Sequence, residues 1–312
     1  MLDVTSCIYK RMNPWRFSRQ AYSFLSNQFH VPKTISKSVS QYRLIEDVED
    51  LDSYHPRGYY PLQIGDELNN SRYRVIDKLG YGGYSTIWLA RDLQMARYVA
   101  LKVITADASC FTQEASVMPS VGNVPSGLGR GVIPPLIDKF WVTGPNDKHT
   151  CIFTPPARMS LFDAKEASTL GLFQPKVAQS IIAQLIHGVA FLHSEQIVHG
   201  DLHLGNILLQ FPEAIDRFST SELCEKFGKP EPEAVIRLDR KPLMDGVLEQ
   251  VFIPGLFGPP EARFSDEPLS FPSDIWTLAC AIWEIAGQRP LFEAFFPTAD
   301  RVTADQVEVL GI

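Results

Sequence analysis

The amino-acid sequence predicts an α+β fold in two parts, an N-terminal part of antiparallel strands and a C-terminal part that is mainly helical. Between residues 73 and 103, three short segments rich in β-branched and aromatic side chains are separated by glycines and polar turns, which is typical of hairpins. Over residues 175–194, apolar residues recur every three or four positions, so we expect an amphipathic helix. Residues 273–286 are apolar nearly all round, which predicts a helix buried on every side.

Charge is spread unevenly along the 312 residues, whose formal net charge is −7. The segment from residue 4 to residue 45 has no acidic residue and carries these basic ones: Lys10, Arg11, Arg16, Arg19, Lys33, Lys37 and Arg43. This composition predicts a disordered basic tail over residues 1–45, and it also resembles a mitochondrial transit peptide. The remaining chain is acidic, which excludes a nucleic-acid binder by charge and suits basic peptide partners.

The cysteine and hydropathy patterns argue against a disulfide-bonded protein, a zinc protein and a membrane-spanning protein. The five cysteines are scattered and form no CxxC pair, which favours a reduced protein without a zinc site: Cys7, Cys110, Cys151, Cys224 and Cys280. No run reaches the roughly 18 apolar residues that a membrane span needs, so we expect no direct membrane anchor of that kind.

The chain divides into a polar connector at 46–72, a β-rich part at 73–154 and a helical part at 155–312. Residues 151–154 form an apolar run that ends at two prolines, which indicates a last strand leading into a hinge. Within the helical part, residues 211–250 are polar and contain several prolines, so we predict a spacer insertion or linker there.

The segment between the first predicted helix and the next apolar run carries the strongest chemical signal. Asp201 and Asn206 stand five residues apart in a loop that begins at His199. This is the catalytic-loop spacing in which an aspartate accepts the proton of a substrate hydroxyl and an asparagine binds Mg²⁺. The plain alternative is an Asn/Asp turn after a helix, which the full spacing disfavours. We interpret His199 as a structural residue that holds the loop.

A glycine-rich turn lies between the first two predicted strands, over residues 80–85. Glycines let backbone amides approach phosphate oxygens, although glycine turns between strands are common and this signal is weak alone. Lys102 follows on the second strand after the turn, where it would bind the phosphates of ATP and pair with an acidic residue. Glu114 is the candidate partner; the alternatives are a solvated strand lysine and a surface helix glutamate. The predicted nucleotide-binding residues are Leu79, Gly80, Tyr81, Gly82, Gly83, Tyr84, Ser85, Ala100 and Lys102.

Taken together, these motifs resemble those of eukaryotic protein kinases, in the same order along the chain. The connector, from Tyr54-His55-Pro56 through Ile64-Gly65-Asp66 to Arg72-Tyr73, is similar to the entry of SR-protein-specific kinases, especially fungal ones. The resemblance extends to Ser85 at the third glycine position, the spacer, Pro259-Pro260-Glu261 and the helix that begins near Asp274.

The resemblance implies a two-lobed protein kinase fold and transfer of the ATP γ-phosphate to Ser or Thr hydroxyls with Mg²⁺. Asp201 would be the catalytic base, Asn206 the magnesium ligand, and Lys102 with Glu114 the phosphate anchor. His203 stands where protein kinases usually place a lysine on the γ-phosphate, so it joins the expected catalytic residues. The implied partner is a protein substrate rich in Arg and Ser. We expect a monomer in the cytoplasm, the nucleus or both, with mitochondrial import left open by the basic tail.

Two departures from the family pattern predict impaired activity. No Asp-Phe-Gly occurs downstream of the loop, and Asp245 and Asp239 are poor substitutes for its metal-binding aspartate. The apolar run at 251–253 is a candidate for the strand that would precede it. Losing the main metal carboxylate would cost on the order of a thousandfold in rate. The large lobe is also expected to be incomplete, because the chain ends soon after the helix at 273–286.

Two other functions fit parts of the sequence. A catalytically dead pseudokinase that serves as a nucleotide-binding scaffold would explain the absent Asp-Phe-Gly. A small-molecule phosphotransferase of the aminoglycoside-kinase type would fit the loop from His199 to Asn206 very well. The glycine-rich turn, the connector and the helix at 273–286 fit that second class poorly.

Overall fold

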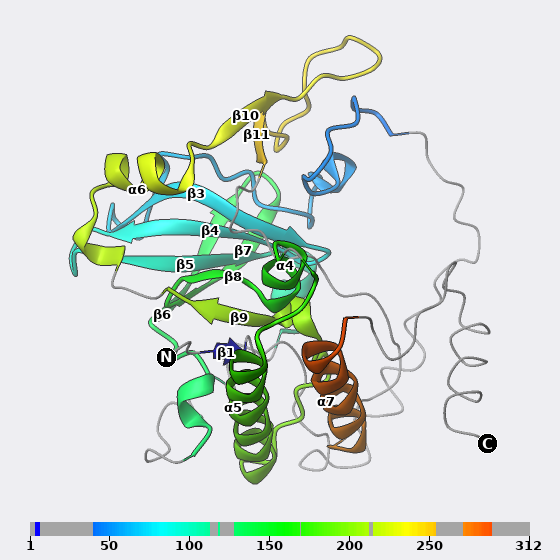
Figure 1. The fold of residues 1–312 in the computed structure, drawn as a ribbon. Coiled ribbons are helices and arrows are strands. Elements are labelled where there is room, and N and C mark those ends of the chain that lie inside the picture. The colour runs from blue at the N-terminus through cyan, green and yellow to red at the C-terminus, as the bar shows by residue number, and fades with distance from the viewer. Residues whose placement is uncertain are drawn as a thin grey trace, which may run out of the picture.

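The computed structural model describes residues 4–6, 40–112, 118, 128–168, 170–211, 215–253 and 271–288. Figure 1 shows an antiparallel sheet in the upper half, a smaller sheet beneath it, and two long helices at the bottom. The predicted α+β fold in two parts is confirmed: strands come first and the main helices later.

The larger sheet is built from six antiparallel strands in the order β2-β3-β4-β5-β7-β6. Their bounds are β2 Glu67–Leu68, β3 Tyr73–Gly82, β4 Ser85–Asp92, β5 Arg97–Ile104, β6 Asp138–Gly144 and β7 Asp147–Thr154. The register brings Gly82 opposite Ser85, so β3 and β4 form a tight hairpin around Gly83 and Tyr84. Lys102 pairs with Ile87 on one side and with Ile152 on the other, in the middle of the sheet.

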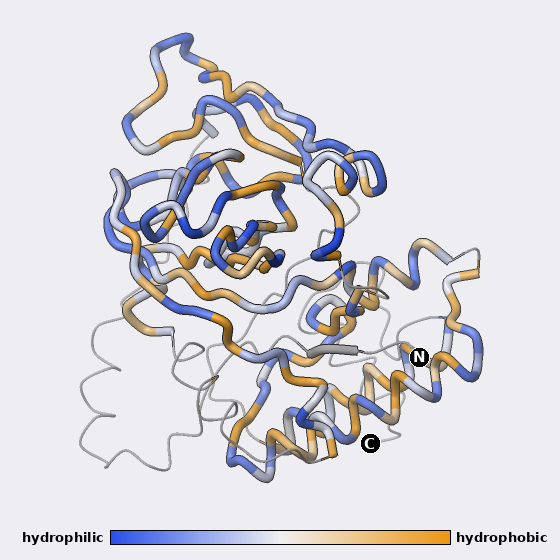
Figure 2. Tube along the Cα trace, turned by 90° about the vertical axis from the view of Figure 1, so that its left-hand side faces the viewer, coloured by the Kyte–Doolittle hydropathy of each residue, from blue (hydrophilic) through white to orange (hydrophobic). Residues whose placement is uncertain are grey.

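One face of this sheet carries the apolar core of the N-terminal part. It consists mainly of side chains that alternate along the strands, among them Tyr73, Val75, Trp88, Ala90, Val99, Leu101, Val103 and Phe153. Figure 2 shows hydrophobic and hydrophilic stretches interspersed along the trace in the upper, strand-rich half of the protein. The connector covers this face with Leu62, which is fully buried, and with the partly buried Tyr60 and Ile64. The connector is therefore part of the packed body.

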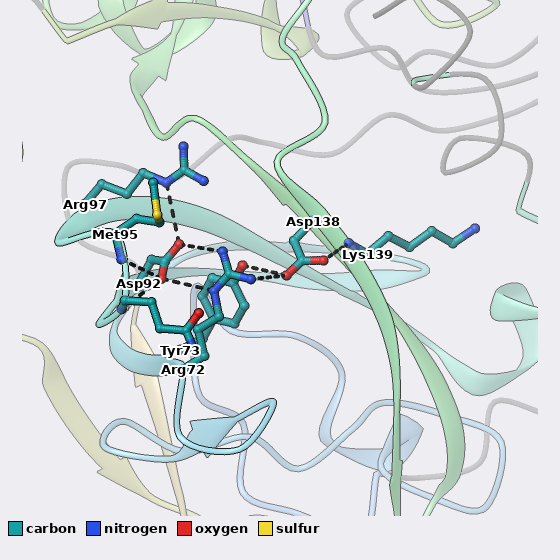
Figure 3. Close-up of polar contacts among 8 residues, drawn as sticks. Arg72, Tyr73, Asp92, Met95, Arg97, Asp138 and Lys139 are labelled. Carbon is teal, nitrogen blue, oxygen red and sulfur yellow. Dashed lines mark hydrogen bonds and ion pairs between the residues drawn. The ribbon is translucent and has the colours of Figure 1, made fainter.

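A buried carboxylate fixes the outer end of the sheet, at the turn between β4 and β5. Asp92 accepts hydrogen bonds from Arg72 Nε and Nη2 at 3.1 and 3.0 Å, while Arg72 Nη1 reaches Asp138 at 3.1 Å (Figure 3). The hydroxyl of Tyr73 donates to the same Asp138 carboxylate at 2.7 Å. Because charge-assisted, bidentate bonds of this kind are strong and directional, they set the alignment of three strands.

The helical part is assembled around the helix α5, Pro175–Ser194, which follows the predicted range. The elements around it are β8 Ala157–Ser160, α4 Leu161–Glu166, the 3₁₀ turn η4 Leu204–Asn206, β9 Ile207–Gln210 and α7 Phe271–Ala286. Its core joins α5, α7, the loop before β9, and α4 through Leu161, Ile181, Leu185, Val189, Leu202, Leu204, Ile207, Ala281 and Ile285. Among the residues that the structure describes, α5 is the one helix long and apolar enough to cross a membrane, a test that core helices of soluble proteins also pass. Its buried face places it in the core.

The prediction that the second long helix is buried on every side is wrong for the part of the chain that the structure describes. Helix α7 buries Leu278, Ala281 and Ile285 in the core shared with α5. On its other side Ile275 and Trp283 are 54% and 55% exposed. The described partners of α7 lie on one side only, so its apolar surface exceeds what they can cover.

The spacer is folded and packs on the strand-rich part, which differs from the linker predicted at 211–250. It contains the 3₁₀ turn η5 Ile215–Arg217, the helix α6 Thr220–Phe227 and the strand β10 Glu231–Ala234, which pairs with β11 Gln250–Ile253. Figure 1 shows α6 beside β3 and the β10–β11 hairpin above the sheet. Phe252 of β11 meets Trp88 edge-on at 6.5 Å, so residues 251–253 belong to the small lobe and do not stand beside the catalytic loop.

Two apolar clusters hold the spacer in place, one against the sheet and one against the N-terminal segment. In one, Ile215 and Leu223 are buried with Ile76, Leu79, Leu89 and Tyr98. In the other, Val235, Leu248 and Val251 are buried with Tyr42, Leu51, Tyr54 and Tyr59 of the N-terminal segment. Packing therefore begins before the predicted connector boundary at residue 46. Residues 4–6 also form a strand, β1 Val4–Ser6, which pairs with β9, so the predicted basic tail contributes backbone pairing.

We expect Leu223→Asp to lower the free energy of unfolding by about 2–4 kcal/mol, because it places an unpaired carboxylate in an apolar cluster. Leu223 is 4% exposed in its contact with the sheet. Chemical denaturation measures the effect. Ser221→Asp is the control, since it adds the same charge at an exposed position of the same helix. Equal stability of the two variants would show that α6 does not pack on the sheet.

Candidate active site

The loop that carries Asp201 is anchored by one buried carboxylate on α7. Asp274 is fully buried and accepts the backbone amides of His199 and Gly200, each at 2.7 Å. The ring Nε2 of His193, near the end of α5, donates to the same carboxylate at 2.9 Å. Gly200 has a φ of 76°, a conformation that favours glycine. The start of the loop is thus held at a fixed distance from both long helices.

The two residues of the loop that were predicted to be functional lie in direct contact. The amide Nδ2 of Asn206 donates to the backbone oxygen of Asp201 at 2.9 Å and to its carboxylate Oδ2 at 3.1 Å. The backbone amide of Asp201 in turn donates to Nδ1 of His199, whose ring is fully buried. These bonds orient the Asp201 carboxylate and agree with a structural role for His199.

His203 presents a buried donor that has no partner in the described residues. Its Nδ1 accepts the amide of Gly205 at 3.1 Å, so the proton of the neutral ring sits on Nε2. Burial lowers the pKa of His203, although the nearby Asp201 carboxylate opposes the shift. The Nε2 atom is buried and makes no hydrogen bond within that part of the chain. The role expected of this position, a hydrogen bond to a phosphate oxygen, requires a local rearrangement that exposes Nε2, because this atom is buried here.

The glycine hairpin and Lys102 lie in the sheet as predicted, at the β3–β4 turn and in β5. Leu79 and Ala100, which we predicted to contact the nucleotide, join the cluster that also contains Ile215 and Leu223 of the spacer. The spacer therefore borders the face of the sheet assigned to the nucleotide. Glu114, the predicted partner of Lys102, lies outside the described residues.

A cavity of about 400 Å³ lies where the two parts of the protein meet. It is lined by the two prolines that follow β7, by the start of β5, by the end of β9 and by the first residues of the spacer, including Pro155, Pro156, Tyr98, Gln210, Phe211 and Asp216. Asp216 accepts the backbone amide of Tyr98 at 2.6 Å, and the hydroxyl of Tyr98 donates to the backbone oxygen of Phe218 at 3.1 Å. The spacer thus packs close to the predicted hinge.

The oxygen ligands for a magnesium ion are few in the described structure. Asn206 is the predicted ligand, and the described residues contain no cluster of three or more His, Cys, Asp or Glu side chains suited to a metal. Gly246, next to Asp245, accepts a hydrogen bond from Asn146 at the β6–β7 turn, and Asp239 pairs with Arg237. Both acids therefore sit in the spacer hairpin over the small lobe, which supports the expectation that neither replaces the metal aspartate.

Sequence reasoning missed three residues that shape this site. The role of Asp274 as a loop anchor had one signal, an acidic residue in the first turn of a mainly apolar helix. Glu49 and Tyr59 of the connector contact the strand and turn of the glycine hairpin, and nothing in the local pattern of the connector indicates those contacts.

Comparison with known proteins gives the family. Residues 73–308, well over half of the chain, match the protein kinase domain. The chain therefore belongs to the protein kinase domain family.

Its relatives include SR-protein kinases. SRSF protein kinase 3 of Sus scrofa is 38% identical over 196 residues, which cover 60% of this chain and 34% of that protein. Protein kinase dsk1 of Schizosaccharomyces pombe is 31% identical over 202 residues, covering 59% of this chain and 36% of that protein. The chain thus spans about a third of the length of these relatives. A serine/threonine protein kinase of Aspergillus fumigatus is 26% identical over 279 residues, with coverage of 81% and 68%.

The fold agrees with this assignment. A solved crystal structure of a kinase domain superposes with a TM-score of 0.51 at 19% sequence identity, covering 76% of this chain and 70% of that one. The predicted protein kinase fold, with an antiparallel N-terminal sheet and a helical C-terminal part, is confirmed, as is the resemblance to SR-protein kinases.

Proposed function

We propose that this protein binds ATP and transfers its γ-phosphate to Ser or Thr hydroxyls of Arg/Ser-rich proteins. The observation that carries the proposal is the pairing of Asp201 and Asn206 on a loop whose backbone is fixed by Asp274. A general base needs a carboxylate held in one orientation, and this loop provides it. The kinship with SRSF protein kinases and the formal net charge of −7 support basic, Arg-rich substrates.

Each residue has a distinct task in this proposal. Asp201 accepts the proton of the substrate hydroxyl as oxygen attacks phosphorus. Asn206 holds Asp201 in place and offers its carboxamide oxygen to magnesium, which when bound would neutralise phosphate charge. His203 donates from Nε2 to the γ-phosphate, while Lys102 and the glycine hairpin hold the other phosphates. Magnesium binding would be weak, because among the described residues Asn206 is the one ligand assigned to it beside the phosphates.

A second function is a scaffold that binds nucleotide without transferring phosphate. The small number of metal ligands among the described residues favours it. The two are separated by incubating the purified protein with radiolabelled ATP, Mg²⁺ and an Arg-Ser repeat peptide. Incorporation that is lost in Asp201→Ala supports the kinase. Absence of incorporation, with ATP still raising the melting temperature, supports the scaffold. If ATP neither labels the peptide nor shifts the melting temperature, both functions fail.

His203→Lys is expected to raise the affinity for ATP about 3- to 10-fold, because a charged donor forms roughly twice as strong a hydrogen bond to phosphate as a neutral one. Since the contact is to the γ-phosphate, the affinity for ADP should stay unchanged. Isothermal titration calorimetry with both nucleotides measures the difference. The control His187→Lys adds the same charge at an exposed position on α5. An equal gain for ADP would place His203 away from the γ-phosphate.

A further inference from the structure

The glycine hairpin is held from outside by the connector. The hydroxyl of Tyr59 donates to the backbone oxygen of Gly82 at 2.7 Å, and both groups are buried. On the far side of the turn, the backbone oxygen of Tyr84 accepts the amide of Thr105 at 2.8 Å. The residue between these anchors, Gly83, has no atom within 4 Å of where a Cβ would be. The tip is thus open while its two flanks are fixed.

Tyr59 is itself held firmly. Its ring lies 5.4 Å from that of Tyr54, its backbone amide donates to Ser53, and its backbone oxygen accepts Asn146 Nδ2 at 2.8 Å. The preceding residue, Gly58, could not carry a side chain, since a Cβ there would lie 2.0 Å from the backbone oxygen of Ser53. Only 4% of Tyr59 is exposed. Its hydroxyl is therefore presented from a rigid turn.

A second contact fixes the strand just before the hairpin. Lys78 is fully buried and pairs with Glu49, which also accepts a hydrogen bond from the hydroxyl of Tyr54. Burial lowers the pKa of Lys78, and Glu49 opposes that shift. Removing two charges from water is costly, so a buried pair of this kind serves geometry more than stability. The pair fixes the position of β3 where this strand approaches the turn.

We propose that Tyr59 is a positioning residue for nucleotide binding. Its bond to Gly82, which we call the Tyr59 tether, keeps the hairpin amides arranged for the phosphates of a nucleoside triphosphate. Glycine-rich turns populate many conformations. Without the tether, part of the binding free energy would be lost in ordering the turn. The proposal rests on the proposed nucleotide binding, but the tether itself is a property of the free protein.

The test is Tyr59→Phe, which removes one hydroxyl and keeps the ring. In the nucleotide-free protein, amide hydrogen exchange over residues 80–86 is expected to accelerate. The affinity for ATP should fall about 2- to 10-fold, the range that one buried hydrogen bond supports. The affinity for adenosine, which has no phosphates, should stay within twofold of the parent protein.

Tyr42→Phe is the matched control. Tyr42 is buried in the same cluster as Tyr59, and its hydroxyl has no hydrogen-bond partner among the described residues. If the amide hydrogens of residues 80–86 exchanged at the same rate in Tyr59→Phe and in Tyr42→Phe, the tether would be overturned. Equal losses of ATP and adenosine affinity would overturn its role in placing phosphates. A parent protein that binds no ATP overturns the proposed function, while hydrogen exchange still decides separately whether the tether exists.

Discussion

Asp274→Ala is expected to lower the free energy of unfolding by about 3–5 kcal/mol and to abolish phosphoryl transfer. The reason is that one buried carboxylate satisfies three donors: the backbone amides of His199 and Gly200 and the ring of His193. Leaving buried donors without an acceptor costs about 1–3 kcal/mol each, partly recovered when the structure relaxes or water enters. The loop would then lose the fixed start on which the orientation of Asp201 depends.

Urea denaturation followed by circular dichroism measures the change in stability, and the peptide assay measures transfer. Ile275→Ala is the control, because Ile275 is the next residue of α7 and is 54% exposed. Truncating this half-exposed side chain should lower the free energy of unfolding by much less than truncating a fully buried isoleucine. If Asp274→Ala were as stable as Ile275→Ala, the loop would have to be held by other contacts, and the site geometry described above would be wrong.

Asp201→Ala is expected to reduce the rate of phosphoryl transfer by about 10²- to 10⁴-fold, the usual contribution of a general base. The affinity for ATP should change less than about twofold, because the proposed contact of Asp201 is with the substrate hydroxyl. Steady-state rates at saturating peptide, together with a nucleotide titration, separate the two effects.

Asp239→Ala and Asp245→Ala serve as controls for this experiment. Both remove a carboxylate from the spacer hairpin, where Asp239 pairs with Arg237 and Gly246 accepts a bond from Asn146. Transfer should proceed at the parental rate in both. A loss comparable with that of Asp201→Ala would instead assign one of these acids to the metal. A parent rate already at the level of Asp201→Ala would favour the scaffold.

Local sequence patterns were enough to predict the strands and helices whose apolar residues recur at a regular spacing. The alternation in β3, β4 and β5 and the helical period of α5 reflect burial on one face, which repeats within a few residues. The loop from His199 to Asn206 was predictable because its chemistry fixes the spacing. The contact between Asn206 and Asp201 within this loop is made through a single turn, η4. Its geometry therefore depends on residues close together in the sequence.

The spacer shows why the remainder could not be predicted. Leu223 stands between Glu222 and Cys224, and Val235 stands between Ala234 and Ile236, which are both exposed, so the local sequence does not mark which apolar residues are buried. Their partners, Leu79 and Tyr54, lie more than 100 residues earlier in the chain. Contacts over such distances depend on the whole fold and leave little local signature. The same holds for the Tyr59 tether, where one hydroxyl meets one carbonyl of a distant turn.

The docking of the spacer also bears on how the chain is made. The six-stranded sheet is complete at residue 154, yet Phe252 and Leu223, which cover parts of it, are synthesised up to about 100 residues later. At translation speeds of about 5–20 residues per second, the uncovered sheet waits roughly 5–20 seconds on the ribosome. During that interval its apolar surface is open to chaperones and to aggregation, so synthesis speed should influence the yield of native protein.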